Sequence, residues 1–587
     1  MMSSVSKVLK DDGARRDAIS LHDRSILVEA GAGSGKTAVM AGRIAAMLAE
    51  GVAPRSIAAV TFTELAASEL LSRVREFVAD LSAGTIATEL RVALPDGLSQ
   101  AHRDNLAAAS AAIDEITCST IHGFCQRLIK PYPAEADIDP GAGVMDRNQA
   151  DLTFLEIVDG WLRERLSGGQ GGILAEMVLH SPGETVALIH KIAENMRRRP
   201  TLTTPPVSPL GGHLTAFRQA TADFANFMDG TAAAEPETVT IVERLAEMAT
   251  AVANGPDPAT PAGLVRLLTS RPHPDLCTRT GAFASYRKKG KWAATAKQAG
   301  LSKADGDRLN DAAETHYTAC CDAWVALAQA VAGHALAALI DEARPILQRY
   351  RDHKRASAQL DFDDLIFAAR DLLRDHDAVR QALGQRFAHV LVDEFQDTDP
   401  LQTEIFWRLC GEPVDGDADW TRFQIRPGAL FLVGDPKQAI YRFRGADVGA
   451  YVQARDAFRA QDPDSLLSIS TNFRSCASIL TFVNERFEAV LSADGQPGFT
   501  ALDPFHDDRG GLCVAALDIA VADENGKASA EQQRDAEADA IAELCARLIE
   551  SHPIIDRRSG AERPCQPGDI ALLAPTGAEL WRYEEAL

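Results

Sequence analysis

The chain has 587 residues and a formal net charge of -23 at pH 7, and 46% of its residues are hydrophobic. This length predicts about four domains, and the apolar content is high enough for buried cores. The acidic balance excludes an overall positive field that attracts nucleic acid, so any contact with nucleic acid must come from a local groove.

The cysteines and the apolar stretches indicate a cytoplasmic protein. The 10 cysteines contain no CxxC pair, which indicates reduced thiols and neither a disulfide framework nor a zinc or iron–sulfur site. The stretch MMSSVSKVLKDDGARR lacks the apolar core of a signal peptide, and the most apolar long stretch, 319–340, is interrupted by Asp322, Gln329 and His334. We therefore expect no membrane association.

The first predicted elements are a short helix at 11–20 and then a strand, phosphate loop and helix at 25–48. An apolar run stops at Ala30, and a glycine-rich turn leads to Lys36 and Thr37, after which apolar residues recur with helical spacing. Such glycines let backbone N–H groups turn around a phosphate at the positive end of the helix. Lys36 would reach the β- and γ-phosphates, and the Thr37 hydroxyl would hold Mg²⁺. A glycine turn that binds nothing is the alternative, but the flanking strand and helix favour a nucleotide site.

Two more strand-to-helix units follow at 57–74 and 116–129. The first strand ends in Thr61, Phe62 and Thr63, at the carboxyl edge where open α/β sheets place ligands. An aromatic residue there is more often part of a core than a ligand contact. His122 lies at the junction of the second unit, and a lone histidine is usually a satisfied polar residue.

Between about 130 and 354, Ala- and Leu-rich helical patterns alternate with loops rich in Pro and Gly, which predicts an inserted, mainly helical domain. Its segment SYRKKGKW, 285–292, interleaves Tyr286 and Trp292 with basic residues. This pattern suits phosphate contact combined with base stacking. A solvated basic loop is an equally good interpretation.

An apolar strand at 389–392 leads into two acids, Asp393 and Glu394. In a phosphate-loop protein the first would hold Mg²⁺ through water, and the second would orient and deprotonate the attacking water. A helix N-cap is the alternative role for such acids. Four apolar or histidine residues that run directly into the acidic pair favour the Mg²⁺ role.

Two later strands also end in polar residues. After the strand at 429–434, Gln438 can hydrogen-bond a γ-phosphate, and Tyr441 and Phe443 alternate with arginines in a way that suits a stacked single strand. Arg474 follows the strand near 465–470 and is a candidate to neutralise transition-state charge. The apolar run at 568–575 predicts one more buried strand.

Six motifs in this order resemble those of the UvrD/RecB-type superfamily 1 DNA helicases, most closely the AddA-like and RecB-like subunits of bacterial double-strand-break repair nucleases. The motifs are AGAGSGKT, TFTELAASEL, STIHGFC, VDEFQDTDPLQ, VGDPKQAIYRFRGAD and NFRS. The resemblance implies an α/β fold with RecA-like lobes, ATP in their cleft, and 3′-to-5′ movement along single-stranded DNA in double-strand-break repair and recombination. Transporter ATPases and GTPases have no counterpart of these motifs.

The resemblance also implies the roles of individual residues. Glu394, Gln438 and Arg474 would be catalytic, and Thr37 and Asp393 would hold Mg²⁺. The ATP site would consist of Ala30, Gly31, Ala32, Gly33, Ser34, Gly35, Lys36, Thr37 and Phe473. The DNA contacts would be Thr61, Phe62, Thr63, His122, Tyr441 and Phe443, of which Phe443 replaces the Trp common at the stacking position.

Some features depart from the family pattern. Arg15 stands where a Gln usually reads adenine, and Ala38 stands where an Arg often stacks on the base. The resemblance covers about the first half of a full-length member, and the later second-lobe motifs and the nuclease domain have no match. The expected organisation is a first RecA-like lobe at 1–130 and 355–467, an inserted helical domain at 131–354, and the incomplete start of a second RecA-like lobe at 468–587.

The resemblance implies single-stranded and double-stranded DNA as partners, together with an AddB-like or other exonuclease subunit. The alternative to a helicase is a fragment or subunit that binds ATP and DNA without autonomous helicase activity. Loss of an in-line arginine supplied by a missing lobe can slow hydrolysis by about 10³ to 10⁵.

Overall fold

The computed structural model describes residues 9–94, 97–169, 171–198, 204–441, 446–508, 513–519, 521, 528–556 and 560–587. Its contacts divide the chain into two compact units. The first, here called the sheet unit, consists of Gly13–Glu29 and Lys36–Ser468. The second, the C-terminal unit, consists of Met1–Asp12, Ala30–Gly35 and Ile469–Leu587.

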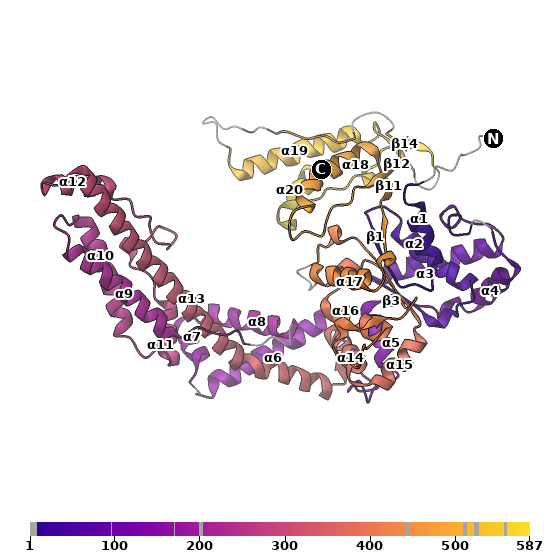
Figure 1. Cartoon of the computed structure of the whole chain (residues 1–587), viewed down its shortest axis with the longest axis horizontal. Helices are drawn as coiled ribbons and strands as arrows, with labels where there is room; N and C mark the ends of the chain where they lie inside the picture. The colour runs from indigo at the N-terminus through magenta and orange to yellow at the C-terminus, as the bar shows by residue number, and fades with distance from the viewer. Residues whose placement is uncertain are drawn as a thin grey trace. The chain divides into compact units, whose positions relative to one another are not determined.

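A six-stranded sheet in the order β10-β1-β9-β6-β2-β3 organises the sheet unit (Figure 1). The strands are β1 (Ile26–Ala30), β2 (Ile57–Thr61), β3 (Thr117–Thr120), β6 (His389–Val392), β9 (Leu430–Gly434) and β10 (Leu466–Ile469). The pairs β1–β9, β9–β6, β6–β2 and β2–β3 are parallel, with Val28 opposite Val433 and Leu391 opposite Ala59. Every residue of β2 and β9 is buried, as expected for central parallel strands covered on both faces.

Helices flank this sheet, which confirms the predicted α/β architecture. They are α1 (Asp12–Ser20), α2 (Lys36–Ala49), α3 (Glu64–Ser82), α4 (Gln100–Ala111), α5 (Ile121–Ile129), α14 (Phe362–Asp375), α15 (Asp377–Arg386), α16 (Pro400–Cys410) and α17 (Val448–Gln461). A single core joins the strands to α5, α14, α16 and α17 and contains Phe124, Phe395, Phe406 and Trp407. A short antiparallel pair, β7 (Gly411–Glu412) with β8 (Gln424–Ile425), lies in the segment between α16 and β9.

The segment between α5 and α14 is mainly helical. Its helices are α6 (Arg147–Ser167), α7 (Ile173–His180), α8 (Pro182–Arg198), α9 (Leu210–Asp229), α10 (Pro236–Ala253), α11 (Pro261–Thr269), α12 (Lys289–Gln298) and α13 (Lys303–Ala356). In Figure 1, α9 and α12 lie along α13. The 54 residues of α13 make a helix of about 80 Å.

Helix α13 passes through two apolar cores. Its first part contributes Tyr317 and Trp324 to a core with α9, α10 and α12, and its second part contributes Leu327 and Ile340 to a core with α6, α7, α8 and α11. By length and composition alone α13 could cross a membrane, which is weak evidence because core helices pass the same test. Part of its apolar surface is buried in these two cores.

Short contacts close the base of the helical segment. Strands β4 (Gly143–Val144) and β5 (Gln359–Leu360) pair where the chain leaves and re-enters the sheet region. Next to this pair, the buried Lys354 ammonium lies 2.9 Å from Asp361 and 2.5 Å from Asp364, and the Tyr350 hydroxyl donates to Asp361 at 2.9 Å. These bonds fix the end of α13 to the start of α14.

The C-terminal unit contains β11 (Thr471–Cys476), α18 (Ala477–Leu491), β12 (Asp503–His506), α19 (Ala530–Leu548), β13 (Pro553–Ile555), β14 (Glu562–Pro564) and α20 (Leu580–Ala586). Strand β12 pairs with β11, and β13 with β14. The predicted strand at 568–575 is wrong, because its residues form no strand and the Leu573 side chain is 96% exposed. A strand needs a neighbour for its backbone hydrogen bonds, and no described strand pairs with this segment.

Candidate functional site

The glycine-rich loop connects β1 to α2 as the sequence predicts. Ala30 is the last residue of β1, and Lys36 and Thr37 are the first two residues of α2. Gly33 and Gly35 have φ angles of 68° and 83°, a conformation that costs glycine little and other residues more. The first backbone N–H groups of α2 have no partner within the helix and give this end a partial positive charge. This local geometry fits a phosphate.

Two carboxylates follow β6 in the sheet unit. Glu394 adopts the left-handed conformation with φ 49°, and its backbone N–H donates to Asp393 Oδ1 at 2.9 Å. The Lys36 ammonium lies 2.6 Å from Glu394 Oε2. The lysine of the phosphate loop and the acid after β6 are therefore brought into direct contact, although 358 positions separate them in sequence.

A hydrogen-bonded network extends from Glu394 to Gln438 through the buried Gln396 and Asp435. Gln396 Nε2 donates to Glu394 Oε2 at 2.8 Å, and Gln396 Oε1 accepts from the Asp435 backbone N–H at 2.9 Å. The Asp435 carboxylate accepts from Gln438 Nε2 at 2.8 Å and lies 2.9 Å from Lys437 Nζ. A change in the position of Gln438 can therefore alter the position of Glu394 through these hydrogen bonds.

Sequence reasoning missed Gln396 and Asp435, although both lie at strand ends beside predicted residues. Each of the two side chains is 2% exposed. A polar residue buried at the carboxyl end of a parallel strand needs a partner, and this requirement is the signal that could have identified them.

Negative charge accumulates around these carboxylates. Burial, and then the charge of Glu394, raise the pKa of Asp393 to about 6, against an opposing effect of Lys36. Burial and Glu394 also raise the pKa of Asp397 to about 6. Carboxylates that resist ionisation in this way would be stabilised by a nearby cation. The oxygen donors of Asp393 and of the half-buried Thr37 are the type that Mg²⁺ prefers.

In the C-terminal unit the strand β11 is bonded to the glycine-rich loop. Asn472 Nδ2 donates to the Ala32 carbonyl at 2.6 Å, and the Phe473 N–H donates to the Gly33 carbonyl at 2.8 Å. Asn472 Oδ1 also accepts the N–H groups of Arg474 and Ser475, each at 2.8 Å. Asn472, a residue that the motif analysis did not single out, thus holds the backbone of Arg474 against the loop.

Other predicted ATP-site residues have defined surroundings. Ala30 and Ser34 are buried, and the Ser34 N–H donates to the Gly31 carbonyl at 3.2 Å. Phe473 is 36% exposed, and its ring lies 4.9 Å from the ring of Phe505. Arg15 is buried.

Two of the predicted DNA contacts meet at the surface of the sheet unit. The rings of Phe62 and Tyr441 stack with their centroids 4.9 Å apart, and Phe62 is 39% exposed. Thr61 is buried and donates to the Thr63 carbonyl at 3.0 Å, while the Thr63 hydroxyl caps α3 by accepting the Ala66 N–H. The two threonines therefore shape the turn that presents Phe62.

His122 lies in a separate aromatic pair. Its ring centroid is 5.0 Å from that of Phe362, which is 40% exposed. Burial lowers the pKa of His122, which favours a neutral ring that can donate or accept a hydrogen bond. The predicted contact Phe443 lies outside the described residues.

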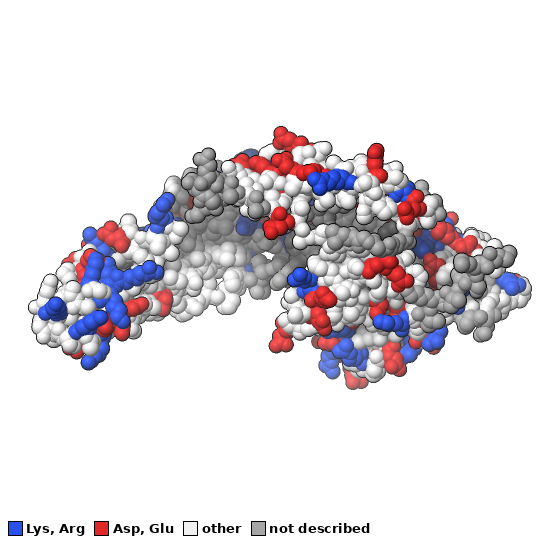
Figure 2. All heavy atoms as spheres, turned by 90° about the horizontal axis from the view of Figure 1, so that it is seen from above, with Lys and Arg blue, Asp and Glu red and all other residues white. Residues whose placement is uncertain are grey.

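The interpretation of 285–292 as a stacking surface is wrong. Trp292 is 0% and Tyr286 8% exposed, and the Trp292 indole donates to the Tyr286 hydroxyl at 2.7 Å inside the core around α13. Lys288 and Lys291 pair with Glu237. Figure 2 shows basic side chains gathered at the end where α12 lies. The two aromatic rings are not available to bases, because their packing against α13 is more favourable than exposure of the rings to solvent.

Comparisons with known proteins agree with the motifs. A family model described as the UvrD/REP helicase N-terminal domain matches residues 12–459. The A subunit of the ATP-dependent helicase/nuclease of Pediococcus pentosaceus is 24% identical over 96% of this chain and 47% of that protein. The protein of the same name from Moorella thermoacetica is 28% identical over 81% of this chain and 34% of its own length.

The exonuclease/helicase subunit RexA of Lactococcus lactis subsp. cremoris is 24% identical over 81% of this chain and 40% of that protein. The chain thus spans less than half the length of these curated relatives.

Proposed function

Because the chain belongs to the UvrD/REP helicase family, we propose that it is the ATP-hydrolysing part of a DNA helicase or translocase that moves 3′ to 5′ along single-stranded DNA. The relatives named as helicase/nuclease A subunits support an AddA-like role in DNA double-strand-break repair and recombination. They are bacterial proteins, and we propose a cytoplasmic location and an AddB-like partner subunit.

The network that links Lys36, Glu394, Gln396, Asp435 and Gln438 is the observation that carries this proposal. It connects a phosphate-loop lysine to an acid that can accept a proton from water and to a glutamine suited to a γ-phosphate. Through its hydrogen bonds, such a network can transmit the effect of losing a phosphate to the end of a neighbouring strand.

We assign the nucleotide and its metal to groups that fit them. ATP would be held by Ala30–Gly35, Lys36 and Thr37, with Phe473 available to stack on the base. Mg²⁺ would be held by Thr37 and Asp393 and, when bound, would screen the charge of the phosphates. Glu394 would accept the proton of the attacking water, and Arg474 would neutralise charge on the γ-phosphate.

DNA would contact the stacked aromatic pair Phe62 and Tyr441 and the pair of His122 with Phe362. Base stacking on aromatic rings is tolerant of sequence, which suits a protein that moves along single-stranded DNA. Thr63 and Phe443 complete the proposed DNA contacts, whereas the buried Thr61 would act by shaping the turn that presents Phe62.

Steady-state ATPase measurements with and without single-stranded DNA test the proposal, with Lys36→Ala as the inactive variant and the exposed Lys303→Ala as the matched control. We expect DNA-stimulated turnover that Lys36→Ala abolishes and Lys303→Ala retains. Unwinding of duplexes with 3′ or 5′ tails then tests direction. Saturable binding of a fluorescent ATP analogue without turnover would overturn the proposal and indicate a nucleotide-binding fragment.

A further inference from the structure

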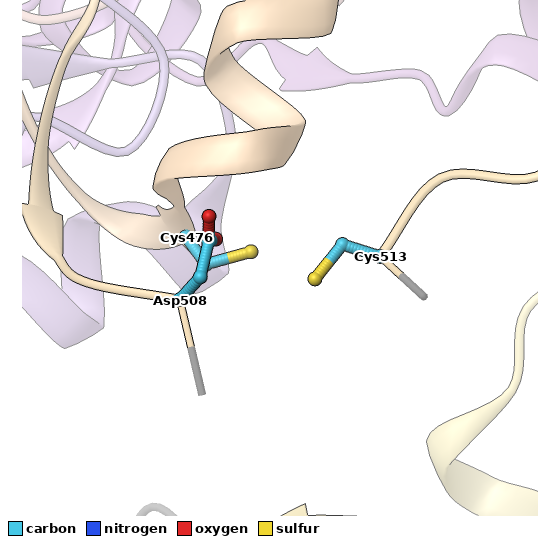
Figure 3. A group of neighbouring side chains, drawn as sticks. All are labelled: Cys476, Asp508 and Cys513. Atoms are coloured by element: carbon cyan, nitrogen blue, oxygen red, sulfur yellow. The ribbon is translucent and has the colours of Figure 1, made fainter. Parts of the chain in front are cut away.

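Three potential metal ligands from separate segments of the C-terminal unit meet outside the proposed ATP and DNA sites. Cys476 precedes α18, Asp508 follows β12, and Cys513 lies further along the chain. The two Sγ atoms and a carboxylate oxygen of Asp508 all lie within 4.8 Å of one another. In Figure 3 the two sulfur atoms point toward each other beside Asp508.

We propose that Cys476, Asp508 and Cys513 bind a thiophilic divalent cation, Zn²⁺. Two thiolates and one carboxylate are donors that Zn²⁺ accepts, whereas Mg²⁺ and Ca²⁺ prefer oxygen donors alone. In tetrahedral Zn²⁺ sites the Zn–S bonds of about 2.3 Å hold two sulfurs about 3.8 Å apart. The observed upper limit of 4.8 Å between the ligand atoms is compatible with this separation.

A neighbouring residue already orients the carboxylate. The Ser478 N–H donates to Asp508 Oδ1 at 2.9 Å, and the Ser478 hydroxyl donates to Oδ2 at 2.6 Å. Both donors belong to the first turn of α18, whose positive end also favours an anionic group. Bonds of this kind hold a ligand in position before the cation arrives and raise the affinity of metal sites.

The site leaves room for a fourth ligand. A depression of about 300 Å³ lies beside Asp508 and is lined by Ala477, Ser478, Thr481, Phe482, Glu485 and Asp508. Asp508 is exposed and the two cysteines are half-buried, so water can supply the fourth donor. Binding releases the protons of both thiols to solvent, which makes the affinity increase with pH.

The proposed cation has a structural consequence that goes beyond ATP hydrolysis. Cys476 ends β11, the strand that carries Arg474. A cation shared with Asp508 and Cys513 would tie the end of this strand to the segment after β12, in addition to the pairing of β11 with β12 and the bonds from Ser478 to Asp508. The absence of a CxxC motif does not oppose this site, because its ligands are distant in sequence and meet through the fold.

The test is a titration of the whole chain with Zn²⁺ after reduction by a phosphine and removal of metal by dialysis. Competition with a chromophoric chelator gives the affinity, and elemental analysis gives the stoichiometry. Co²⁺ substitution reports thiolate ligands through their charge-transfer absorption. We expect about one cation per chain bound through thiolates, and a loss of affinity in Cys476→Ser and Cys513→Ser that Cys277→Ser, a half-buried cysteine elsewhere, does not cause.

Ser478→Ala keeps all three ligands and removes only the hydroxyl bond to Asp508, so we expect an affinity about 10-fold lower. This variant keeps the test decisive if a cysteine variant fails to fold. Failure of the reduced chain to bind Zn²⁺ would overturn the proposal, as would equal loss of binding in Cys277→Ser. A Cys476–Cys513 disulfide with no metal bound after its reduction would also overturn it. None of these outcomes depends on ATPase activity, so they are separate from failure of the proposed function.

Discussion

The Lys36 ammonium lies 2.6 Å from the Glu394 carboxylate, which also accepts a hydrogen bond from Gln396. Only 10% of the Lys36 side chain is exposed, so a phosphate group that binds Lys36 must compete with this carboxylate. Removal of the negative charge of Glu394 therefore has two opposite effects, one on nucleotide binding and one on hydrolysis.

We expect Glu394→Gln to bind ATP more tightly than the unmodified chain and to hydrolyse it about 10² to 10⁴ times more slowly. Loss of the competing charge frees Lys36, and loss of the proton acceptor removes general-base catalysis. Binding of a fluorescent ATP analogue and steady-state ATPase rates measure the two effects. The exposed Glu184→Gln is the control, and weaker binding by Glu394→Gln would contradict competition for Lys36.

The raised pKa of Asp393 predicts a pH-dependent effect on stability. Its pKa rises from an ordinary 3.8 to about 6 in the folded chain, so the folded state binds more protons than the unfolded state between these values. The free energy of unfolding therefore falls as pH rises from about 4 to 6. Above pH 6 the folded chain carries the full destabilisation that comes from the ionised Asp393.

Asp393→Asn removes this destabilisation of the folded chain by the ionised carboxylate. Without nucleotide or metal we expect the variant to be more stable by about 3 kcal/mol at pH 7.5, because the pKa rises by about two units and each unit corresponds to about 1.4 kcal/mol, and nearly unchanged at pH 4. Melting temperatures at the two pH values check this, with the exposed Asp229→Asn as the control. An equal gain at both pH values would mean that the effect does not come from ionisation. Hydrolysis should be lost at the same time.

The sequence was sufficient to predict the strand-to-helix units, because each has an apolar run, a polar turn and helical periodicity. It also indicated Lys36 and Glu394, whose motifs are local and whose side chains the structure brings into contact. It could not identify Gln396, Asp435 or Asn472 as connecting residues, since their partners depend on which strands are neighbours. The order β1-β9-β6 brings together segments that are hundreds of residues apart.

The same limit explains the two wrong interpretations. Tyr286 and Trp292 look like a stacking pair because basic residues surround them, but the burial of an aromatic ring is decided by the distant helix α13. The run at 568–575 has the composition of a strand, but a strand also needs a paired neighbour, which composition does not provide.

Replacement of Trp292 should act on stability and not on DNA binding. Trp292→Ala removes a fully buried ring and the donor to Tyr286, and large-to-small changes of this kind cost about 3 to 5 kcal/mol. We expect a lower unfolding midpoint of the helical segment and its faster proteolysis. The exposed Lys289→Ala should leave the midpoint unchanged. A folded Trp292→Ala chain that has selectively lost affinity for DNA would contradict this assignment.

We expect the stacked pair of Phe62 and Tyr441 to contribute to DNA binding through the exposed surface of the two rings. Stacking of one base on an aromatic side chain is worth about 1 to 3 kcal/mol, so Phe62→Ala should weaken binding of single-stranded DNA about 5- to 150-fold. The double variant with Tyr441→Ala should be less than additive because the rings contact each other. Fluorescence anisotropy measures the affinities, with Phe487→Ala, an exposed aromatic in α18, as the control.

Gly33 tests whether the bonds between the glycine-rich loop and β11 matter for nucleotide binding. Its φ of 68° is unfavourable for alanine by about 1 to 2 kcal/mol. A Cβ atom would also lie 2.7 Å from both Asn472 Nδ2 and Arg474 Cβ, so the loop or β11 must move. We expect Gly33→Ala to lower the affinity for an ATP analogue and to lower the melting temperature.

Gly160→Ala is the matched control, because Gly160 lies inside α6 with no atom within 4 Å of the added Cβ. This substitution should stabilise the chain by up to about 1 kcal/mol. If Gly33→Ala bound the analogue as tightly as Gly160→Ala, the position of Asn472 and Arg474 against the loop would have no role in nucleotide binding.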